Sequence, residues 1–251
     1  MNILQKIITN TKSKIEVRKL DYPLKKMKVD IESFDLTKTS FKSSIVNKDQ
    51  AIIAEIKKAS PSAGIINEDF NPISKAKEYE VFGASALSVL TEEDFFLGSI
   101  QYLKDIKKNT SLPILRKDFI VDPYQIYESK LIGADCILLI ASALSDTELR
   151  EFSDLADNLE LDYLIEVHDE KELSRAESFS NAIIGVNNRN LKTFEVDIQN
   201  SIKLRNLLTK ENIFVAESGI KSQADIDILI ANNIHIFLIG ESLMNGDFLE
   251  A

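Results

Sequence analysis

Residues 51–64 read AIIAEIKKASPSAG, an apolar run that passes directly into charged residues and then into a turn. Five later segments share this pattern: LPILRKDF (112–119), LDYLIEVH (161–168), AIIGVNNRN (182–190), IFVAESG (213–219) and HIFLIGES (235–242). Apolar runs of this kind are typical of parallel strands that helices cover on both faces. In a barrel of such strands the carboxyl ends converge on one mouth, so we expect the chemistry there.

Helical patterns separate the predicted strands. We place strands at 52–57, 86–91, 113–117, 136–140, 163–167, 183–187, 213–216 and 236–240. Two of the helices between them have clear start signals: Asn71 stands before Pro72, and Ser145 precedes Glu148 at the spacing of a capping box. The alternation of strands and helices predicts the α/β class and a (β/α)8 TIM barrel.

The length of 251 residues matches one such barrel. Residues 1–50 precede the first strand, and apolar residues recur there at helical spacing, at Ile3, Leu4, Ile7 and Ile8. We therefore expect a single domain over residues 1–251, in which an N-terminal helical extension (1–50) leads into the barrel (51–251).

The carboxyl end after Met244 is too short for a full eighth helix. A shortened final helix predicts that apolar surface near Ile52, Ile236 and Leu238 is exposed or covered by a partner. The chain would then be a monomer or a weak homo-oligomer.

Composition narrows the class of partner and the compartment. The net charge of −10 argues against nucleic acid, although an anionic small molecule could bind where Lys and Arg gather. The only cysteine, Cys136, lies in an apolar run, which excludes a disulfide framework. We find no secretory signal and no apolar run long enough for a membrane span, so we expect a cytoplasmic protein.

The charged residues at the strand ends allow two readings. Such residues are usually solvated rim charges, but their recurrence at six strand ends favours a shared site. Glu55 and Lys57 lie two residues apart and therefore share a face of their strand, whereas Arg116 and Lys117 face opposite ways. Alternation alone leaves open which of that last pair faces the barrel lumen.

The loops after the strands also carry candidates. Ser60–Gly64 is either a turn or a hydroxyl-and-amide site for an oxyanion. Ser218 and Gly219 follow the seventh strand, and Gly240 and Glu241 follow the eighth, where barrels commonly hold a phosphate. The structural reading is favoured for His168, which either caps its strand or supports Glu166, and for His235 at the amino end of a strand. No dinucleotide, P-loop or zinc motif is present, so a dinucleotide fold, a P-loop and the usual zinc sites have no support.

Seven ordered segments together resemble one family. EIKKASPSAG (55–64), LSVLTEEDFFLGS (87–99), LRKDF (115–119), LIEVH (164–168), GVNNRNL (185–191), AESGI (216–220) and LIGESLM (238–244) are similar to the indole-3-glycerol-phosphate synthases of tryptophan biosynthesis. The resemblance implies closure of 1-(2-carboxyphenylamino)-1-deoxy-D-ribulose 5-phosphate to indole-3-glycerol phosphate, with loss of CO2 and water, by a carbon–carbon lyase. Acid–base groups and electrostatics suffice for every step of this reaction, so we expect neither a metal nor an organic cofactor.

The resemblance also implies roles. Lys117 matches the general acid, so Arg116 is expected to face outward and to tolerate replacement better. The remaining catalytic candidates are Glu55, Lys57, Glu166 and Asn187. Substrate contacts fall to Arg189, Glu217, Ser218, Phe96, Phe119 and Leu191, the last three of the six as apolar walls, and phosphate falls to Ser60, Gly219, Gly240 and the amide of Glu241.

Three other functions remain as alternatives. A sister barrel, phosphoribosylanthranilate isomerase or the tryptophan synthase α subunit, would share the phosphate loops but lacks the EIKKASPS and LRKDF segments together. A phosphate-ligand binder without catalysis would lose an acid or a base, and a structural subunit would need neither. The intact set of Glu55, Lys57, Lys117 and Glu166 disfavours the last two.

Overall fold

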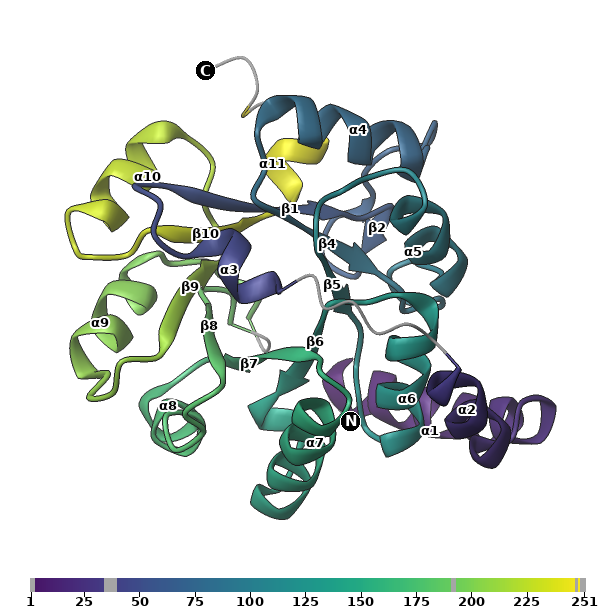
Figure 1. The fold of residues 1–251 in the computed structure, drawn as a ribbon. Coiled ribbons are helices and arrows are strands. Elements are labelled where there is room, and N and C mark those ends of the chain that lie inside the picture. Colours follow the sequence, from purple (N-terminus) through teal and green to yellow (C-terminus); the bar gives the residue numbers. More distant parts are fainter. Residues whose placement is uncertain (1–2, 34–39, 191–192, 247, 249–251) are drawn as a thin grey trace.

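Eight parallel strands close into a barrel in the computed structural model, which describes residues 3–33, 40–190, 193–246 and 248 (Figure 1). Neighbouring strands follow in chain order, and the last strand pairs with the first. Their bounds are β1 Ala51–Ile56, β4 Ala86–Leu90, β5 Ile114–Lys117, β6 Cys136–Ile140, β7 Asp162–Val167, β8 Ile183–Asn187, β9 Ile213–Glu217 and β10 Ile236–Ile239. The structure confirms the predicted (β/α)8 TIM barrel.

Helices connect the strands and surround the barrel. They are α4 Pro72–Phe82, α5 Ile100–Lys107, α6 Pro123–Ile132, α7 Asp146–Asn158, α8 Glu170–Ala176, α9 Gln199–Leu207, α10 Gln223–Ile230 and α11 Glu241–Met244, with a 3-10 turn, η1 Ala141–Ala143, after β6. The start signals act as predicted. Asn71 caps α4 by accepting a hydrogen bond from the Ser74 amide, and Ser145 forms a capping box with Glu148 on α7.

Strand alternation separates two buried cores. On β5, Leu115 points into the lumen, whereas Ile114 points outward between the strands and the helices. The short helix α3 Phe41–Ile45 closes the amino end of the lumen and lies in front of the barrel in Figure 1. Phe41 and Ile45 are fully buried there, which stabilises the closure by about 1.5–3 kcal/mol for each side chain.

The rest of the extension packs elsewhere. Helices α1 Ile3–Asp21 and α2 Leu24–Glu32 lie beside α6, where Ile15 and Met27 form a small core with Tyr124. The first turns of α1 reach the opposite end of the barrel from α3 and line its mouth with Ile3, Leu4 and Ile7. The extension therefore closes one end of the barrel and narrows the other.

The exposure predicted at the carboxyl end was wrong. Ile52 is 7%, Ile236 8% and Leu238 4% exposed. Ile236 and Leu238 belong to the lumen core, so an eighth helix would never have covered them. Ile52 does face outward, into the core between strands and helices. Phe248 joins that core, and its ring packs edge-on against Phe82 with 6.5 Å between the ring centroids. The four-residue helix α11 and Phe248 thus cover the outer surface where the last strand pairs with the first.

No described helix is long and apolar enough to cross a membrane.

Candidate active site

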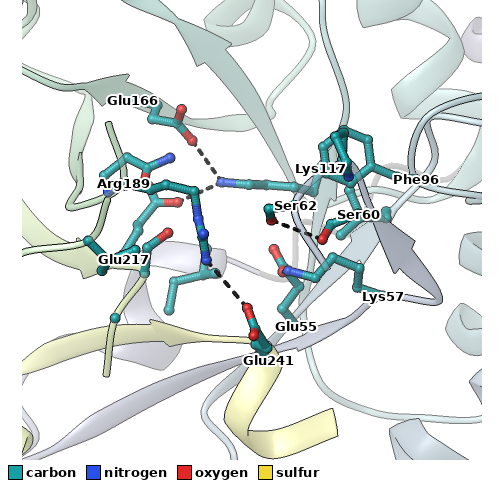
Figure 2. A pocket seen from close by; sticks show the side chains of 18 of the residues that line it. Glu55, Lys57, Ser60, Ser62, Phe96, Lys117, Glu166, Arg189, Glu217 and Glu241 are labelled. Carbon is teal, nitrogen blue, oxygen red and sulfur yellow. Dashed lines mark hydrogen bonds and ion pairs between the residues drawn. The ribbon is translucent and has the colours of Figure 1, made fainter. Parts of the chain in front are cut away.

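Five strands deliver polar side chains to one cavity at the mouth of the barrel (Figure 2). Glu55 comes from β1, Lys117 from β5, Glu166 from β7, Asn187 from β8 and Glu217 from β9. All five occupy lumen-facing positions at the carboxyl ends of their strands, so barrel closure brings them together. The cavity measures about 540 Å³, enough for a small phosphorylated molecule.

Lys117 lies at the centre of the inner ion cluster, which we define as Lys117, Glu166 and Glu217. Its Nζ donates hydrogen bonds to Oε2 of Glu166 at 2.9 Å and to Oε2 of Glu217 at 2.6 Å. Burial by itself would lower the pKa of Lys117, but Glu166, Glu217 and Glu55 outweigh it and raise that pKa. The ammonium is therefore the resting form. A third N–H remains without a partner among the described residues.

The two carboxylates of the inner ion cluster titrate differently. Burial raises the pKa of Glu217 to about 7, against the attraction of Lys117 and with the repulsion of Glu166 added. Burial opposes ionisation of Glu166 too, but Lys117 and His168 lower its pKa. At neutral pH Glu166 is thus the firmly ionised carboxylate, while Glu217 is close to its titration point.

Gly185 makes room for Glu217. A Cβ at this β8 position would lie 2.1 Å from Oε1 of Glu217 and 2.5 Å from Cδ2 of Leu164, both closer than any real contact. That Oε1 atom is buried and has no hydrogen-bond partner among the described residues. The absence of a side chain at Gly185 therefore determines where the Glu217 carboxyl can lie.

A second charged pair lines the same cavity. Nζ of Lys57 lies 2.6 Å from Oε1 of Glu55, and both side chains are mostly buried. The expectation that the two share a face is met. Gly240 packs against this carboxylate, because a Cβ there would lie 2.5 Å from Oε1 of Glu55.

Polar residues of the loops surround the cavity mouth. Arg189 forms an ion pair with Glu241 at 3.3 Å, and its amide donates to Oδ1 of Asn187 at 3.0 Å. Ser218 and Gly219 have φ values of 66° and 80°. Because both residues are left-handed, the chain turns sharply after β9, and both line the cavity.

The segment after β1, predicted to be either a turn or an oxyanion site, forms a small antiparallel hairpin of β2 Ala59–Ser60 and β3 Gly64–Ile65. Oγ of Ser60 accepts a hydrogen bond from the Ala63 amide at 3.1 Å and lies 3.2 Å from Oγ of Ser62. Ser60 and Ser62 both line the cavity. The hairpin thus turns two hydroxyl groups towards the mouth.

An aromatic wall forms the apolar side of the cavity. The rings of Phe96 and Phe119 lie 5.9 Å apart, and Phe96 is held by a loop whose amides donate to the buried carboxylate of Glu92. Leu191, predicted as a third wall, lies outside the described residues. The sequence reading missed Phe194, which lines the cavity from the loop after β8 with a positive φ of 61°. Phe194 lies within a loop, so the pattern of residues at strand ends does not predict it.

Arg116 faces outward, as expected, but it is not a surface residue. It is 0% exposed and belongs to the outer ion cluster, which we define as Arg116, Asp118 and Glu128. All five guanidinium N–H groups are used: they donate to Thr91 Oγ1, Gln125 O, Ser129 Oγ, Asp118 Oδ2 and Glu128 Oε2. Burial makes this arginine a structural cation, so its replacement should lower the free energy of unfolding, while the smaller effect on turnover stays a prediction.

The two histidines lie at opposite ends of the barrel. His168 follows β7 and lies 3.4 Å from Glu166. His235 precedes β10, where its Nδ1 lies 2.9 Å from the carbonyl oxygen of Asp49. Within the described ranges, no group of three or more His, Cys, Asp or Glu side chains is arranged to hold a metal ion.

The structure places every candidate site residue except Leu191 in this one cavity. Comparison with known proteins agrees with the geometry. The sequence model described as indole-3-glycerol phosphate synthase matches residues 4–251. A protein of that name from Ruminiclostridium cellulolyticum is 50% identical, over 98% of this chain and 95% of the relative. Another, from Endomicrobium trichonymphae, is also 50% identical, over 97% of this chain and 95% of the relative.

Solved structures show the fold alone. A tryptophan synthase α subunit from Pyrococcus furiosus superimposes with a TM-score of 0.59 at 13% identity, over 77% of this chain and 88% of its own. Identity this low carries no argument about activity.

Proposed function

The chain belongs to the indole-3-glycerol phosphate synthase family, and on that premise we propose how its cavity residues divide the reaction. The enzyme is a carbon–carbon lyase that converts 1-(2-carboxyphenylamino)-1-deoxy-D-ribulose 5-phosphate to indole-3-glycerol phosphate, CO2 and water in tryptophan biosynthesis. The ring carbon that bears the carboxylate attacks the ketone carbon, the carboxylate leaves as CO2, and the former ketone oxygen leaves as water. Each change needs a proton donor or acceptor at a defined place.

Lys117 is the general acid. The observation that carries this assignment is the ammonium held between Glu166 and Glu217 on a lysine that lines the cavity. The raised pKa keeps the proton on nitrogen until a basic oxygen approaches. A ketone oxygen that gains negative charge during ring closure is such an acceptor, so transfer occurs in the transition state and not before.

Glu166 is the base for the dehydration. Of the two inner carboxylates, it is the one whose lowered pKa keeps it ionised and able to accept a proton. Lys57, paired with Glu55, supplies positive charge next to the carboxylate that is lost and takes part in the second proton transfer. Asn187, Arg189, Glu217 and Ser218 contact the substrate from the ends of β8 and β9.

The remaining candidates bind the two ends of the substrate. Phe96 and Phe119, with Leu191, pack against the anthranilate ring. The phosphate binds Ser60 and the backbone near Gly219, Gly240 and Glu241, where small residues leave amides accessible. The ends of the molecule are thereby held about a common reaction centre.

A turnover assay tests the proposed function. The chain contains no tryptophan, so indole emission excited beyond tyrosine absorption comes only from product. We expect the emission to appear when purified protein meets the carboxyphenylamino substrate, with or without a chelator. Folded protein that produces no emission would overturn the assignment.

We also propose that the chain acts as one domain over residues 1–251, in the cytoplasm, as a monomer or a weak homo-oligomer. The burial of Ile52 on the outer face of the first strand supports the proposed oligomeric state, because that surface needs no partner to cover it. Sedimentation at several concentrations tests the oligomeric state.

A further inference from the structure

His168 lies between two carboxylates at the edge of the inner ion cluster. Its Nδ1 lies 3.1 Å from Oε2 of Glu172, and its Nε2 lies 3.4 Å from Oε1 of Glu166. The imidazole is mostly buried, and Nε2 makes no hydrogen bond with any described residue. The mechanism above gives this histidine no task.

The local fold holds the imidazole in this place. Glu172 binds His168 twice, because the same Oε2 that faces the ring also accepts the backbone N–H at 2.8 Å. Asp169 caps α8 and accepts from the Glu172 amide at 2.9 Å. From α9, Asn200 donates to the carbonyl oxygen of His168 at 3.1 Å. Three contacts to His168, two from Glu172 and one from Asn200, leave this residue little freedom.

The geometry favours the doubly protonated ring. A neutral imidazole carries one N–H, so it would present a lone pair to one of the two carboxylates, whereas an imidazolium presents an N–H to both. Burial would lower the pKa of His168, but Glu172 on α8, Glu166 on β7 and Glu217 on β9 together raise it. Asp169, the next residue in the chain, adds a carboxylate that caps α8, and the ammonium of Lys117 on β5 lies beyond Glu166, on the other carboxylate oxygen.

We infer that His168 is a positioning residue whose imidazolium keeps Glu166 ionised and oriented while Lys117 gives up its proton. The inference rests on the proposed function for the role of Glu166. Two buried carboxylates share the single ammonium of Lys117, so once that proton moves to substrate, Glu166 would lose its nearest positive charge. The imidazolium of His168 remains beside Oε1 of Glu166. Glu166 therefore stays ionised after Lys117 has given up its proton, and can accept a proton in the dehydration.

The pH profile of kcat, which includes the dehydration after CO2 is lost, tests the inference with three variants. His168→Gln removes the cation. Glu172→Gln keeps an acceptor for the His168 backbone N–H but removes the charge that favours the imidazolium. His235→Gln is the matched control, because it replaces the only other histidine, far from the cavity.

Loss of the imidazolium raises the pKa of Glu166, and a base must be ionised to act, so the acid limb of the profile should move to higher pH. We expect a shift of roughly one pH unit for His168→Gln, so that kcat falls about tenfold on the acid side and much less on the alkaline side. Glu172→Gln should shift the limb in the same direction by less. His235→Gln should match the wild type.

A purely structural histidine would give a different result. If turnover falls by the same factor at every pH in His168→Gln, the limb stays in place and the inference is wrong. If His168→Gln does not fold, as judged by circular dichroism, Glu172→Gln decides in its place, because it retains the histidine. An unshifted limb in that variant overturns the inference.

Nuclear magnetic resonance separates this inference from the proposed function. The two histidine ring signals, assigned with His235→Gln, report the pKa of His168 without any substrate. We expect that pKa above the ordinary value of about 6.5, and lower in Glu172→Gln than in the wild type. A value at or below about 6.5 overturns the inference even in an active enzyme, whereas a protein without turnover overturns only the proposed function.

Discussion

Arg116 and Lys117 are neighbours on β5, and each is a buried cation between two carboxylates. They differ in how many of their N–H groups have a hydrogen-bond acceptor. In the outer ion cluster all five N–H groups of Arg116 have acceptors and the side chain is 0% exposed. In the inner ion cluster two N–H groups of Lys117 have acceptors, the third has none among the described residues, and the side chain lines a cavity of about 540 Å³.

This difference indicates how to separate a structural cation from a chemical one. Burial and ion pairing are common to both clusters, so neither property identifies a site. A fully satisfied cation has no donor left for a substrate, and its removal leaves two carboxylates in a dry core. A partly satisfied cation beside a cavity can exchange a protein acceptor for a substrate oxygen.

Replacement of Arg116 should give the largest effect. Arg116→Met keeps an apolar stem but leaves Asp118 and Glu128 without their cation, so we expect a loss of about 3–5 kcal/mol in the free energy of unfolding. Denaturant titration measures it. Turnover per folded molecule should fall less than in Lys117→Met. Wild-type stability in Arg116→Met would show that the outer ion cluster has no structural role.

Replacement of Lys117 should act mainly on turnover, in contrast to replacement of Arg116. Lys117→Met preserves length and packing but removes the acid, so kcat should fall by about a hundredfold or more, which corresponds to roughly 2.7 kcal/mol in the activation barrier. KM should change much less, because the phosphate and ring contacts remain. A variant with kcat near the wild-type value would remove Lys117 from the role of acid.

Glu217 should reveal the inner ion cluster in the pH dependence of stability. Its folded pKa of about 7 is above the ordinary value of 4.5, so the native state holds this proton longer than the unfolded state. Stability therefore falls as pH rises through that window. In Glu217→Gln this decline disappears, and relative to the wild type the variant should gain on the order of 2 kcal/mol between about pH 4.5 and about pH 7.5. Parallel curves of unfolding free energy against pH would contradict the assignment.

An exposed ion cluster should give the smallest effect. Nζ of Lys14 on α1 lies 2.9 Å from Glu93 and 2.7 Å from Asp94, and the three side chains are 36–43% exposed. Water screens such pairs, so Lys14→Met should cost no more than about 1 kcal/mol, and the cost should shrink at high salt. A loss as large as that of Arg116→Met would show that short ion-pair distances alone predict stability, which the comparison denies.

Much of the site was accessible from the sequence because its signal is local. The acidic and basic residues follow apolar runs at fixed offsets, and parallel strands of one barrel share a direction, so Glu55, Lys117, Glu166 and Glu217 had to meet at one end. Phe194 lacked such a signal, because it lies in a loop whose path no periodicity describes. The prediction for Ile236 and Leu238 failed for a related reason: both lie in the lumen core, and an apolar run does not show which of its alternate residues face the lumen.

The sequence by itself determined the barrel, the end that carries chemistry and the family. The period of two along each strand and the alternation of strands with helices are properties of the chain alone. Only the tertiary structure decided that Arg116 is satisfied and buried, that Lys117 bridges Glu166 and Glu217, and that His168 faces Glu166. These facts depend on distances and on exclusion of water. Both arise when the barrel closes and the helices pack around it, and no single segment encodes them.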